Sequence, residues 1–111
     1  MPTTRQNKVS RLIQRELGTQ FQRESRDLYG GAIITVTVVR VTADLGLARV
    51  YLSLYPNDKK QEILNEVKFN AKHIRYELGQ KIRHQLKKIP ELEFYIDDSL
   101  DYIEHIEELL K

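Results

Sequence analysis

The apolar residues of the first part of the chain recur every three or four positions, the spacing of one face of an α-helix. They are Val9, Leu12, Ile13, Leu17 and Phe21. The pattern predicts a helix over residues 5–23, with Thr3 or Thr4 as its N-cap. Gly18 lies inside this helix and should cost it about 1 kcal/mol relative to alanine. A loop that ends in the glycine pair at 30–31 is expected to follow.

Two segments then change to the pattern of β-strands. Residues 33–41 are rich in β-branched side chains, and residues 48–55 alternate between two faces. The side chains expected to face the core are Ala48, Val50, Leu52 and Leu54, and those expected to face away are Arg49, Tyr51, Ser53 and Tyr55. Residues 43–46, Ala-Asp-Leu-Gly, are a turn signal, so the two strands should form an antiparallel hairpin.

A long amphipathic stretch follows Pro56, and Asn57 or Asp58 can cap its start. Helical periodicity continues to about residue 87, as one helix or as two helices that meet at a shallow kink. Its apolar arc comprises Ile63, Leu64, Val67, Ala71, Ile74, Leu78 and Ile82. Pro90 ends the helical stretch, because the residue before a proline is disfavoured in helical conformation.

A third strand is predicted over residues 93–97, with Phe94 and Ile96 facing the core, and a last helix over Ser99–Leu110. Together these elements predict an α+β domain with a three-stranded sheet and its helices packed on one face. The last strand is reached through a helical crossover, so at least one strand pair should be parallel. A chain of 111 residues can bury one core, and we expect residues 1–111 to form a single domain.

Charge is separated along the chain, although the net charge is only +2. Residues 1–26 carry six basic and two acidic side chains, and residues 68–88 carry seven basic and one acidic. Residues 91–111 carry eight acidic side chains and one basic. This distribution favours a basic partner-binding surface with an acidic tail. The absence of cysteine, of a bilayer-length apolar run and of an N-terminal signal region leads us to expect a cytoplasmic protein without a membrane partner.

The second helical stretch predicts a basic face of one sign. Lys68, Lys72, Arg75, Arg83 and Lys87 fall within about 100° of its surface, with Phe69 and Tyr76 at the border and Gly79 in the middle. Such cations bind phosphates, and nearby rings can stack bases. The alternative interpretation is a solvated face whose lysines cover apolar neighbours. The first helix repeats the pattern opposite its apolar side, and the full set of predicted RNA-contacting residues is Lys8, Arg11, Arg15, Lys68, Lys72, Arg75, Tyr76, Arg83, Lys87 and Lys88.

Other candidate chemistry is weak. Asp97, Asp98 and Asp101 could bind a divalent metal, but helix capping and an ordinary solvated face explain such acids better. The three histidines lack the spacing of a helical zinc site, and no phosphate-binding loop or nucleophile elbow occurs. Tyr51, Tyr55 and Tyr95 could share the outer face of the sheet, where they could stack bases or form a half-covered surface. We therefore expect no enzyme, no metal and no cofactor.

Several stretches together resemble bacterial ribosome-binding factor A over nearly the whole chain. They are Ile-Thr-Val-Thr-Val-Val-Arg-Val at 34–41, Asp-Leu at 44–45, Ala-Arg-Val-Tyr-Leu-Ser at 48–53, Ile-Arg-Tyr-Glu-Leu-Gly at 74–79, and Ile-Pro-Glu-Leu-Glu-Phe-Tyr-Ile-Asp-Asp-Ser-Leu at 89–100. The resemblance implies a type II KH-like fold with the order αββααβ, here with a short C-terminal helix added. It also implies binding to the small ribosomal subunit and its rRNA during assembly, release on completion, a role in growth at low temperature, and no catalysis.

One triplet departs from the family pattern. KH domains carry Gly-x-x-Gly between two helices, where the backbone clamps nucleotides. Ribosome-binding factor A has Ala-x-Gly at this kink, and here the matching triplet is Asn70, Ala71 and Lys72. A lysine in place of the glycine favours recognition of RNA through side-chain charge.

The leading hypothesis is therefore a monomeric assembly factor that binds small-subunit rRNA and the immature small subunit. Helix-borne cations would hold phosphates along the second helical stretch, and Lys8, Arg11 and Arg15 would complete the groove. The alternative is a protein-interaction module whose basic face binds an acidic protein.

Overall fold

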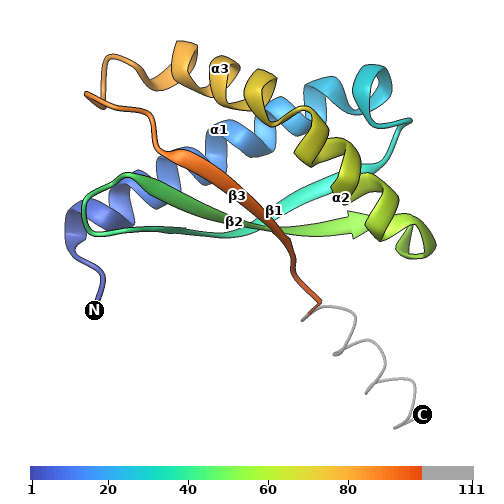
Figure 1. Cartoon of the computed structure of the whole chain (residues 1–111), viewed down its shortest axis with the longest axis horizontal. Coiled ribbons are helices and arrows are strands. Elements are labelled where there is room, and N and C mark those ends of the chain that lie inside the picture. Colours follow the sequence, from blue (N-terminus) through green and yellow to red (C-terminus); the bar gives the residue numbers. More distant parts are fainter. Residues whose placement is uncertain (99–111) are drawn as a thin grey trace, which may run out of the picture.

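The computed structural model describes residues 1–98 as an α+β fold (Figure 1). Its elements are α1 (Thr4–Leu28), β1 (Ile33–Val41), β2 (Leu47–Tyr55), a 3-10 turn (Asn57–Lys59), α2 (Lys60–Phe69), α3 (Ala71–Ile82) and β3 (Glu91–Ile96). The sheet order is β1-β2-β3, with β1 and β2 antiparallel and β2 and β3 parallel. The predicted α+β class, element order and parallel pair are confirmed; the helix expected over Ser99–Leu110 lies outside the described residues.

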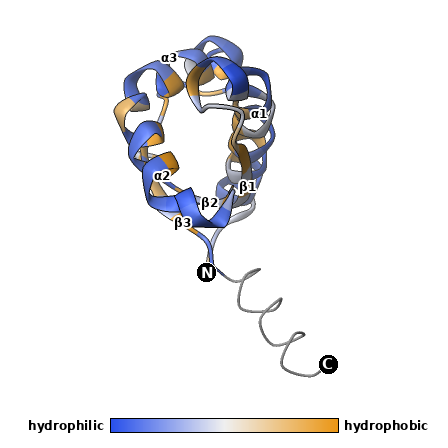
Figure 2. Ribbon diagram, turned by 90° about the vertical axis from the view of Figure 1, so that its right-hand side faces the viewer, coloured by the Kyte–Doolittle hydropathy of each residue, from blue (hydrophilic) through white to orange (hydrophobic). Residues whose placement is uncertain are grey.

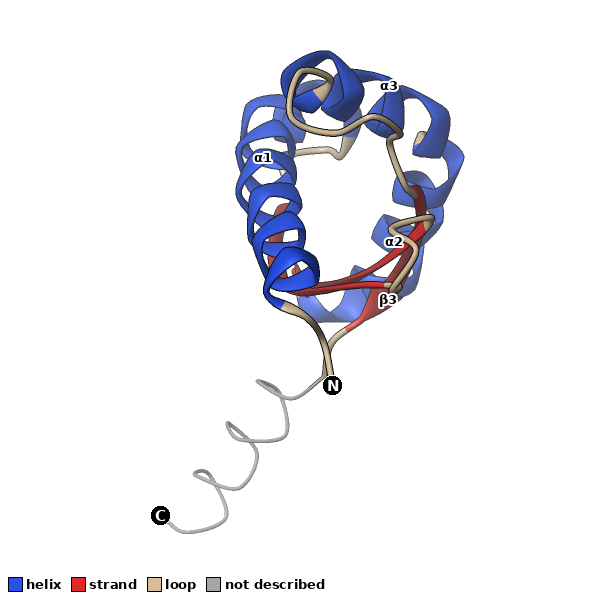
Figure 3. Ribbon diagram, turned by 90° about the vertical axis from the view of Figure 1, so that its left-hand side faces the viewer, coloured by secondary structure: helices blue, strands red, loops and turns tan. Residues whose placement is uncertain are grey.

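The three helices lie over one face of the sheet, and their hydrophobic (orange) residues are on the side that faces the core (Figure 2). The view from the opposite side shows the sheet as the floor of this arrangement (Figure 3). The β2 residues predicted to face the core are all buried there: Ala48, Val50, Leu52 and Leu54. Every second residue of the central strand thus joins the helices, as a half-buried strand requires.

Helix α1 begins at the predicted cap. The Thr3 hydroxyl accepts a hydrogen bond from the Gln6 backbone N–H at 3.1 Å, and the Gln6 side chain accepts one from the Thr3 N–H at 2.9 Å. This reciprocal pair is a capping box. The helix continues to Leu28, five residues past the predicted end, because no strong helix breaker precedes the glycine pair at 30–31.

Two glutamines of α1 also bind the backbone of β1. Gln6 Nε2 donates to the Val41 carbonyl at 2.9 Å. Gln14 Nε2 donates to the carbonyls of Val36 and Thr37, both at 3.1 Å, where the register shifts at a bulge. The edge strand is therefore held to the helix by polar contacts as well as by the core.

The long helical stretch divides at Asn70. The Asn70 side chain and backbone N–H both donate to the Glu66 carbonyl, which ends α2, and the Asn70 carbonyl accepts from Ile74 in the first turn of α3. The predicted caps are wrong, because Asn57 and Asp58 lie within the 3-10 turn and make no side-chain capping bond to α2. Of the two arrangements left open by the periodicity, the structure has two helices.

The predicted end of the stretch near residue 87 is also wrong, because α3 ends at Ile82. Arg75 binds the carbonyls of Ile89 and Pro90, so the chain must return to the middle of the helix. A helix continued to residue 87 would end about 18 Å past Arg75, and three extended residues cover only about 10 Å. The turn after Ile82 leaves enough chain for this return.

Candidate nucleic-acid interface

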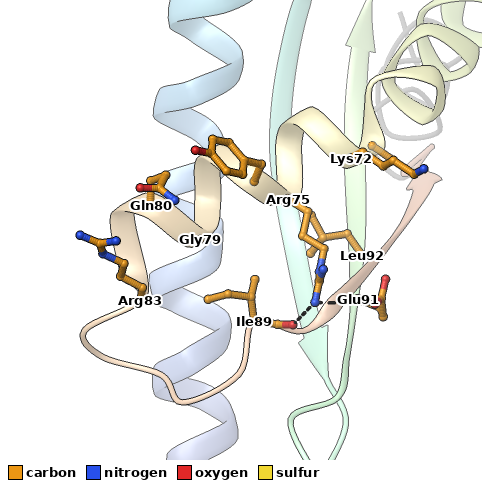
Figure 4. A pocket seen from close by; sticks show the side chains of 10 residues that line it. Lys72, Arg75, Gly79, Gln80, Arg83, Ile89, Glu91 and Leu92 are labelled. Carbon is orange, nitrogen blue, oxygen red and sulfur yellow. Dashed lines mark hydrogen bonds and ion pairs between the residues drawn. The ribbon is translucent and has the colours of Figure 1, made fainter.

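A groove of about 690 Å³ lies between α3 and the start of β3 (Figure 4), and we call it the α3–β3 groove. It is lined by Ala71, Lys72, Arg75, Tyr76, Gly79, Gln80, Arg83, Ile89, Glu91 and Leu92. Four of the predicted RNA-contacting residues are among them: Lys72, Arg75, Tyr76 and Arg83. The fold thus gathers into one hollow residues that the sequence places on one helix face.

Helical spacing aligns the polar wall of this groove. Lys72 and Tyr76 of α3 and Arg83, its C-cap, follow one another at intervals of four and seven residues, so they lie on one side of the helix. All three are exposed, and Tyr76 retains 64% of its accessible surface. Within residues 1–98 neither Lys72 nor Arg83 makes an ion pair, so both cations are available to an anionic ligand.

Gly79 keeps the middle of the groove open. A Cβ built at this position would lie 3.4 Å from Cγ1 of Ile89, an ordinary contact distance. An alanine would therefore fit, whereas a longer side chain would occupy the hollow. Ala71, Ile89 and Leu92 form the apolar part of the lining.

Arg75 differs from the other cations, because the protein itself uses its guanidinium (Figure 4). Its Nη2 donates to the Ile89 carbonyl at 2.7 Å, and its Nε donates to the Pro90 carbonyl at 3.1 Å. Its Nη2 also lies 3.6 Å from Oε1 of Glu91. These contacts attach the start of β3 to α3, so Arg75 builds the groove and contributes little uncompensated charge to it.

The remaining predicted residues of the second basic stretch lie outside the groove lining. Lys68 is exposed near the end of α2. Lys87 and Lys88 are exposed in the segment between α3 and β3. The predicted single arc of five cations is therefore wrong for Lys87, because the helix that would have aligned it ends earlier.

The basic residues of α1 border a second hollow of about 370 Å³. Lys8, Arg11 and Arg15 line it with Gln85 and Leu86. The expectation that they complete the same groove is corrected, because the structure has two hollows. The segment 83–89 borders both hollows, because Arg83 and Ile89 line the α3–β3 groove and Gln85 and Leu86 line the second hollow. The lysines at 87–88 belong to the same segment.

Sequence reasoning missed the non-helical wall of the α3–β3 groove. Gln80 could have been found, because it lies one helical turn beyond Tyr76. Ile89, Glu91 and Leu92 come from the segment after the helix, and only the packing of β3 brings them to the site. No local pattern in the sequence indicates that contact.

The outer face of the sheet carries the predicted tyrosines. Tyr51 of β2 and Tyr95 of β3 stack with ring centroids 5.3 Å apart. Tyr55, also on β2, is 60% exposed. The Tyr95 hydroxyl donates to Glu93 at 2.7 Å, and this hydrogen bond raises the pKa of the Tyr95 phenol. Arg49 pairs with the same carboxylate at 3.6 Å. This face holds charges of both signs and is less suited to phosphates than the α3–β3 groove.

The aspartates considered as metal ligands have other partners. Asp97 accepts a hydrogen bond from the Thr37 hydroxyl at 2.6 Å, and Asp98 lies 3.4 Å from Nζ of Lys60. Asp101 lies outside the described residues. Across residues 1–98, no cluster of three or more histidine, cysteine, aspartate or glutamate side chains could hold a metal ion.

The histidines have ordinary surroundings where the structure describes them. Nε2 of His73 lies 3.0 Å from Oε1 of Glu24, a contact between α3 and α1. His84 is exposed after α3, and His105 lies outside the described residues. In the part of the chain from Met1 to Asp98, no helix is long and apolar enough to cross a membrane.

Comparison with known sequences gives one family. A family model described as Ribosome-binding factor A matches residues 5–110. The ribosome-binding factor A of Flavobacterium psychrophilum is 49% identical over 111 residues, covering 99% of this chain and 85% of the relative. That of Cytophaga hutchinsonii is 44% identical over 110 residues, covering 99% of this chain and 83% of the relative.

Solved structures share the fold. The crystal structure of ribosome-binding factor A from Thermus thermophilus has a TM-score of 0.69 at 18% identity, over 82% of this chain and 94% of that one. A homology model of the Thermus thermophilus factor, fitted into a cryo-electron-microscopy map of a 30S complex, has a TM-score of 0.62 at 22% identity, over 78% of this chain and 89% of that one.

Proposed function

The chain belongs to the ribosome-binding factor A family, and from this membership we propose that it binds the immature small ribosomal subunit, contacts its rRNA and assists its maturation. The fold is the type II KH-like fold that the sequence resemblance implied. The Thermus thermophilus factor described above is placed in a complex with the 30S subunit, which supports the same partner for this chain. The observation that carries the proposal is the α3–β3 groove, where an exposed ring meets cations that form no ion pair within residues 1–98.

Each residue of the groove has a separate part in the proposal. Lys72 and Arg83 lie eleven positions apart, or about 16 Å along a helix, so they hold different phosphates. Tyr76 lies between them and offers its ring to an unstacked base. Arg75 keeps the opposite wall in place through its two backbone hydrogen bonds.

The other predicted cations act at longer range. Lys68 lies on α2, beyond one end of the groove, and the lysines at 87–88 follow its other end. Lys8, Arg11 and Arg15 line the neighbouring hollow. We assign these residues to phosphate contacts that attract and orient the RNA without reading its sequence.

The proposal extends to the whole chain. Residues 1–111 act as a single RNA-binding domain, as a monomer in the cytoplasm, and as a binding protein without catalysis. The protein leaves the subunit when assembly is complete, and cells need it most at low temperature. A deletion strain should therefore accumulate immature small subunits and grow more slowly in the cold than its parent.

The direct test is co-sedimentation of the purified protein with small subunits from growing cells. The double variant Lys72→Glu/Arg83→Glu should lose most of its binding and keep its fold, because both side chains are exposed. A matched control is Arg40→Glu/Lys59→Glu, which reverses two exposed cations outside the groove lining and should bind as the wild type does. Equal binding by the two double variants would contradict the assignment of the groove.

An acidic protein partner is the second candidate. Phe69 favours it, because this ring is 89% exposed beside Lys68 at the end of α2, an arrangement common to protein interfaces. Nuclease treatment separates the two candidates. A complex held by rRNA should dissociate when the RNA is digested, whereas a complex with an acidic protein should survive.

A further inference from the structure

A third hollow lies at the opposite edge of the sheet from the α3–β3 groove. It has a volume of about 600 Å³ and separates the C-terminal half of α1 from the first half of β1. Gly18, Phe21, Ser25 and Arg26 contribute from α1, and residues 31–36 form the other side. We call it the α1–β1 groove. Nothing in the proposed RNA contacts uses it.

The strand along this groove has a free edge. The sheet order gives β1 a single neighbour, β2, among residues 1–98. The carbonyl of Val36 accepts from Gln14 of α1, so it points away from β2. Backbone groups alternate in direction along an antiparallel strand, so the N–H and C=O of Ile34 point the same way. A donor and an acceptor thus face the groove at the spacing of a β-ladder.

The stretch of β1 backbone that is open to pairing is short, because side chains of α1 already bind the carbonyls at both of its ends. The Ser25 hydroxyl donates to the Ala32 carbonyl. At the other end Gln14 holds the carbonyls of Val36 and Thr37, beside the bulge. A second copy of β1 could not pair along this strand without displacing these contacts. A short peptide centred on Ile34 can pair there, because its backbone supplies a donor and an acceptor at the spacing of the ladder.

Gly18 shapes the other wall of the groove. A glycine inside a helix costs about 1 kcal/mol relative to alanine. A Cβ at position 18 would meet nothing within 4 Å, so the fold does not require this glycine for packing. Its effect is to leave room above the buried ring of Phe21, where an apolar side chain of a ligand could pack. Arg26 is exposed at the end of the groove near the start of β1.

We propose that the α1–β1 groove binds a short extended peptide segment of a partner protein. The peptide adds a strand to β1 through the backbone of Ile34 and the N–H of Val36. One of its apolar side chains packs over Gly18, and an acidic residue at one end pairs with Arg26. The site is separate from the RNA-binding groove, so the protein can hold an RNA and a protein segment at once.

The test uses the full chain, labelled with ¹⁵N, and the synthetic peptide acetyl-Glu-Val-Thr-Val-Thr-Val-Glu-amide. Its backbone supplies the recognition, and the acid at each end suits either orientation. The amide signals of Ile34 and Val36 should shift, and their hydrogen exchange should slow. The same peptide N-methylated at alternate amides on its pairing edge should not bind. Absence of these changes at millimolar peptide would overturn the proposal, as would changes confined to the tyrosine face of the sheet.

A pair of leucine substitutions on α1 tests the groove itself. Gly18→Leu should fold, because the space above Gly18 is open, and should weaken peptide binding about tenfold or more by filling the groove. Thr19→Leu places the same side chain on the neighbouring exposed position and should leave peptide binding unchanged. Equal affinities for the two variants would overturn the proposal. So would sedimentation showing a dimer that Gly18→Leu abolishes, because the occupant would then be a second copy.

Discussion

The position of Arg75 in the sequence predicts the side of the helix on which it lies, but not the partners of its guanidinium. Its position on the basic side of α3 predicted a phosphate contact, and it does line the groove. Its guanidinium is nevertheless engaged by the carbonyls of Ile89 and Pro90, fourteen and fifteen positions away. The sequence indicates which side of the helix a cation occupies, but its partner depends on where the following segment folds back.

Replacement of Arg75 by lysine should therefore act on stability. A lysine keeps the charge but cannot donate two bonds in a planar fork, so the attachment of β3 to α3 weakens. We expect Arg75→Lys to lower the free energy of unfolding by about 1 kcal/mol, since the site is partly exposed. Lys72→Gln should leave it within about 0.5 kcal/mol. Urea unfolding of both variants measures the difference, and equal midpoints would show that Arg75 has no structural part.

Tyr29 gives a second prediction for a single residue. Its ring packs edge-on against Phe21 at 5.8 Å, and its hydroxyl is buried without a hydrogen-bond partner in the described part of the chain. Burial, with help from Glu24 and Glu66, raises the pKa of this phenol to about 12. Tyr29→Phe removes an unpaired polar atom and should leave the protein as stable or up to about 1 kcal/mol more stable.

The raised pKa of Tyr29 also determines how the free energy of unfolding changes with pH. Between pH 10 and about 12 the unfolded chain has lost this proton and the folded one still binds it, so the free energy of unfolding falls as the pH rises. Tyr29→Phe should lose less stability over this range than the wild type. Urea unfolding at pH 9 and pH 11 measures this, and parallel losses in the two proteins would contradict it.

At the scale of elements, the pattern of apolar residues located the strands and helices well and their ends less well. Strand β1 has its predicted bounds, and β2 begins one residue earlier than predicted. Helix α3 ends five residues early, although all of residues 83–87 except His84 are good helix formers. What stops it is the need to return to Arg75, a tertiary constraint that is invisible in a local window. The division at Asn70 likewise depends on how that side chain binds its own helix end.

The capping box predicts the effect of a change at the start of α1. Thr3→Ala removes the hydroxyl that accepts from the Gln6 N–H, and should lower the free energy of unfolding by about 1 kcal/mol. Thr4→Ala is the matched control, because Thr4 is the first residue inside the helix and alanine suits that position. Thermal unfolding should separate the two variants. A Thr4→Ala variant as destabilised as Thr3→Ala would argue against the cap.

At the scale of the whole molecule, the two grooves lie at opposite edges of the sheet. The α3–β3 groove carries Lys72 and Arg83, which form no ion pair in the described part of the chain, and the α1–β1 groove lies beside a strand edge. The sequence predicted the cations of the first groove because they share a helix face. It could not show the second groove, which exists only because α1 packs beside a strand that ends the sheet.

Binding to small subunits should depend on salt in proportion to the phosphates contacted. Each lost contact should reduce the slope of log affinity against log salt concentration by about 0.7 to 0.9. We expect this reduction for Lys72→Gln and for Arg83→Gln, and none for Arg40→Gln on the outer face of the sheet. Binding measured from low to moderate salt gives the slopes. An unchanged slope for Lys72→Gln would mean that this lysine touches no phosphate.

The parallel pairing of β3 with β2 also sets a time order during synthesis. It joins Leu47 to Glu91, 44 positions apart, and a contact this distant in sequence cannot form until both ends of it have been made. The ribosome delivers the N-terminal elements first, so the hairpin and the helices emerge before the strand that closes the α3–β3 groove. A growing chain therefore cannot grip RNA through this groove while its last described strand is still inside the ribosome that is making it.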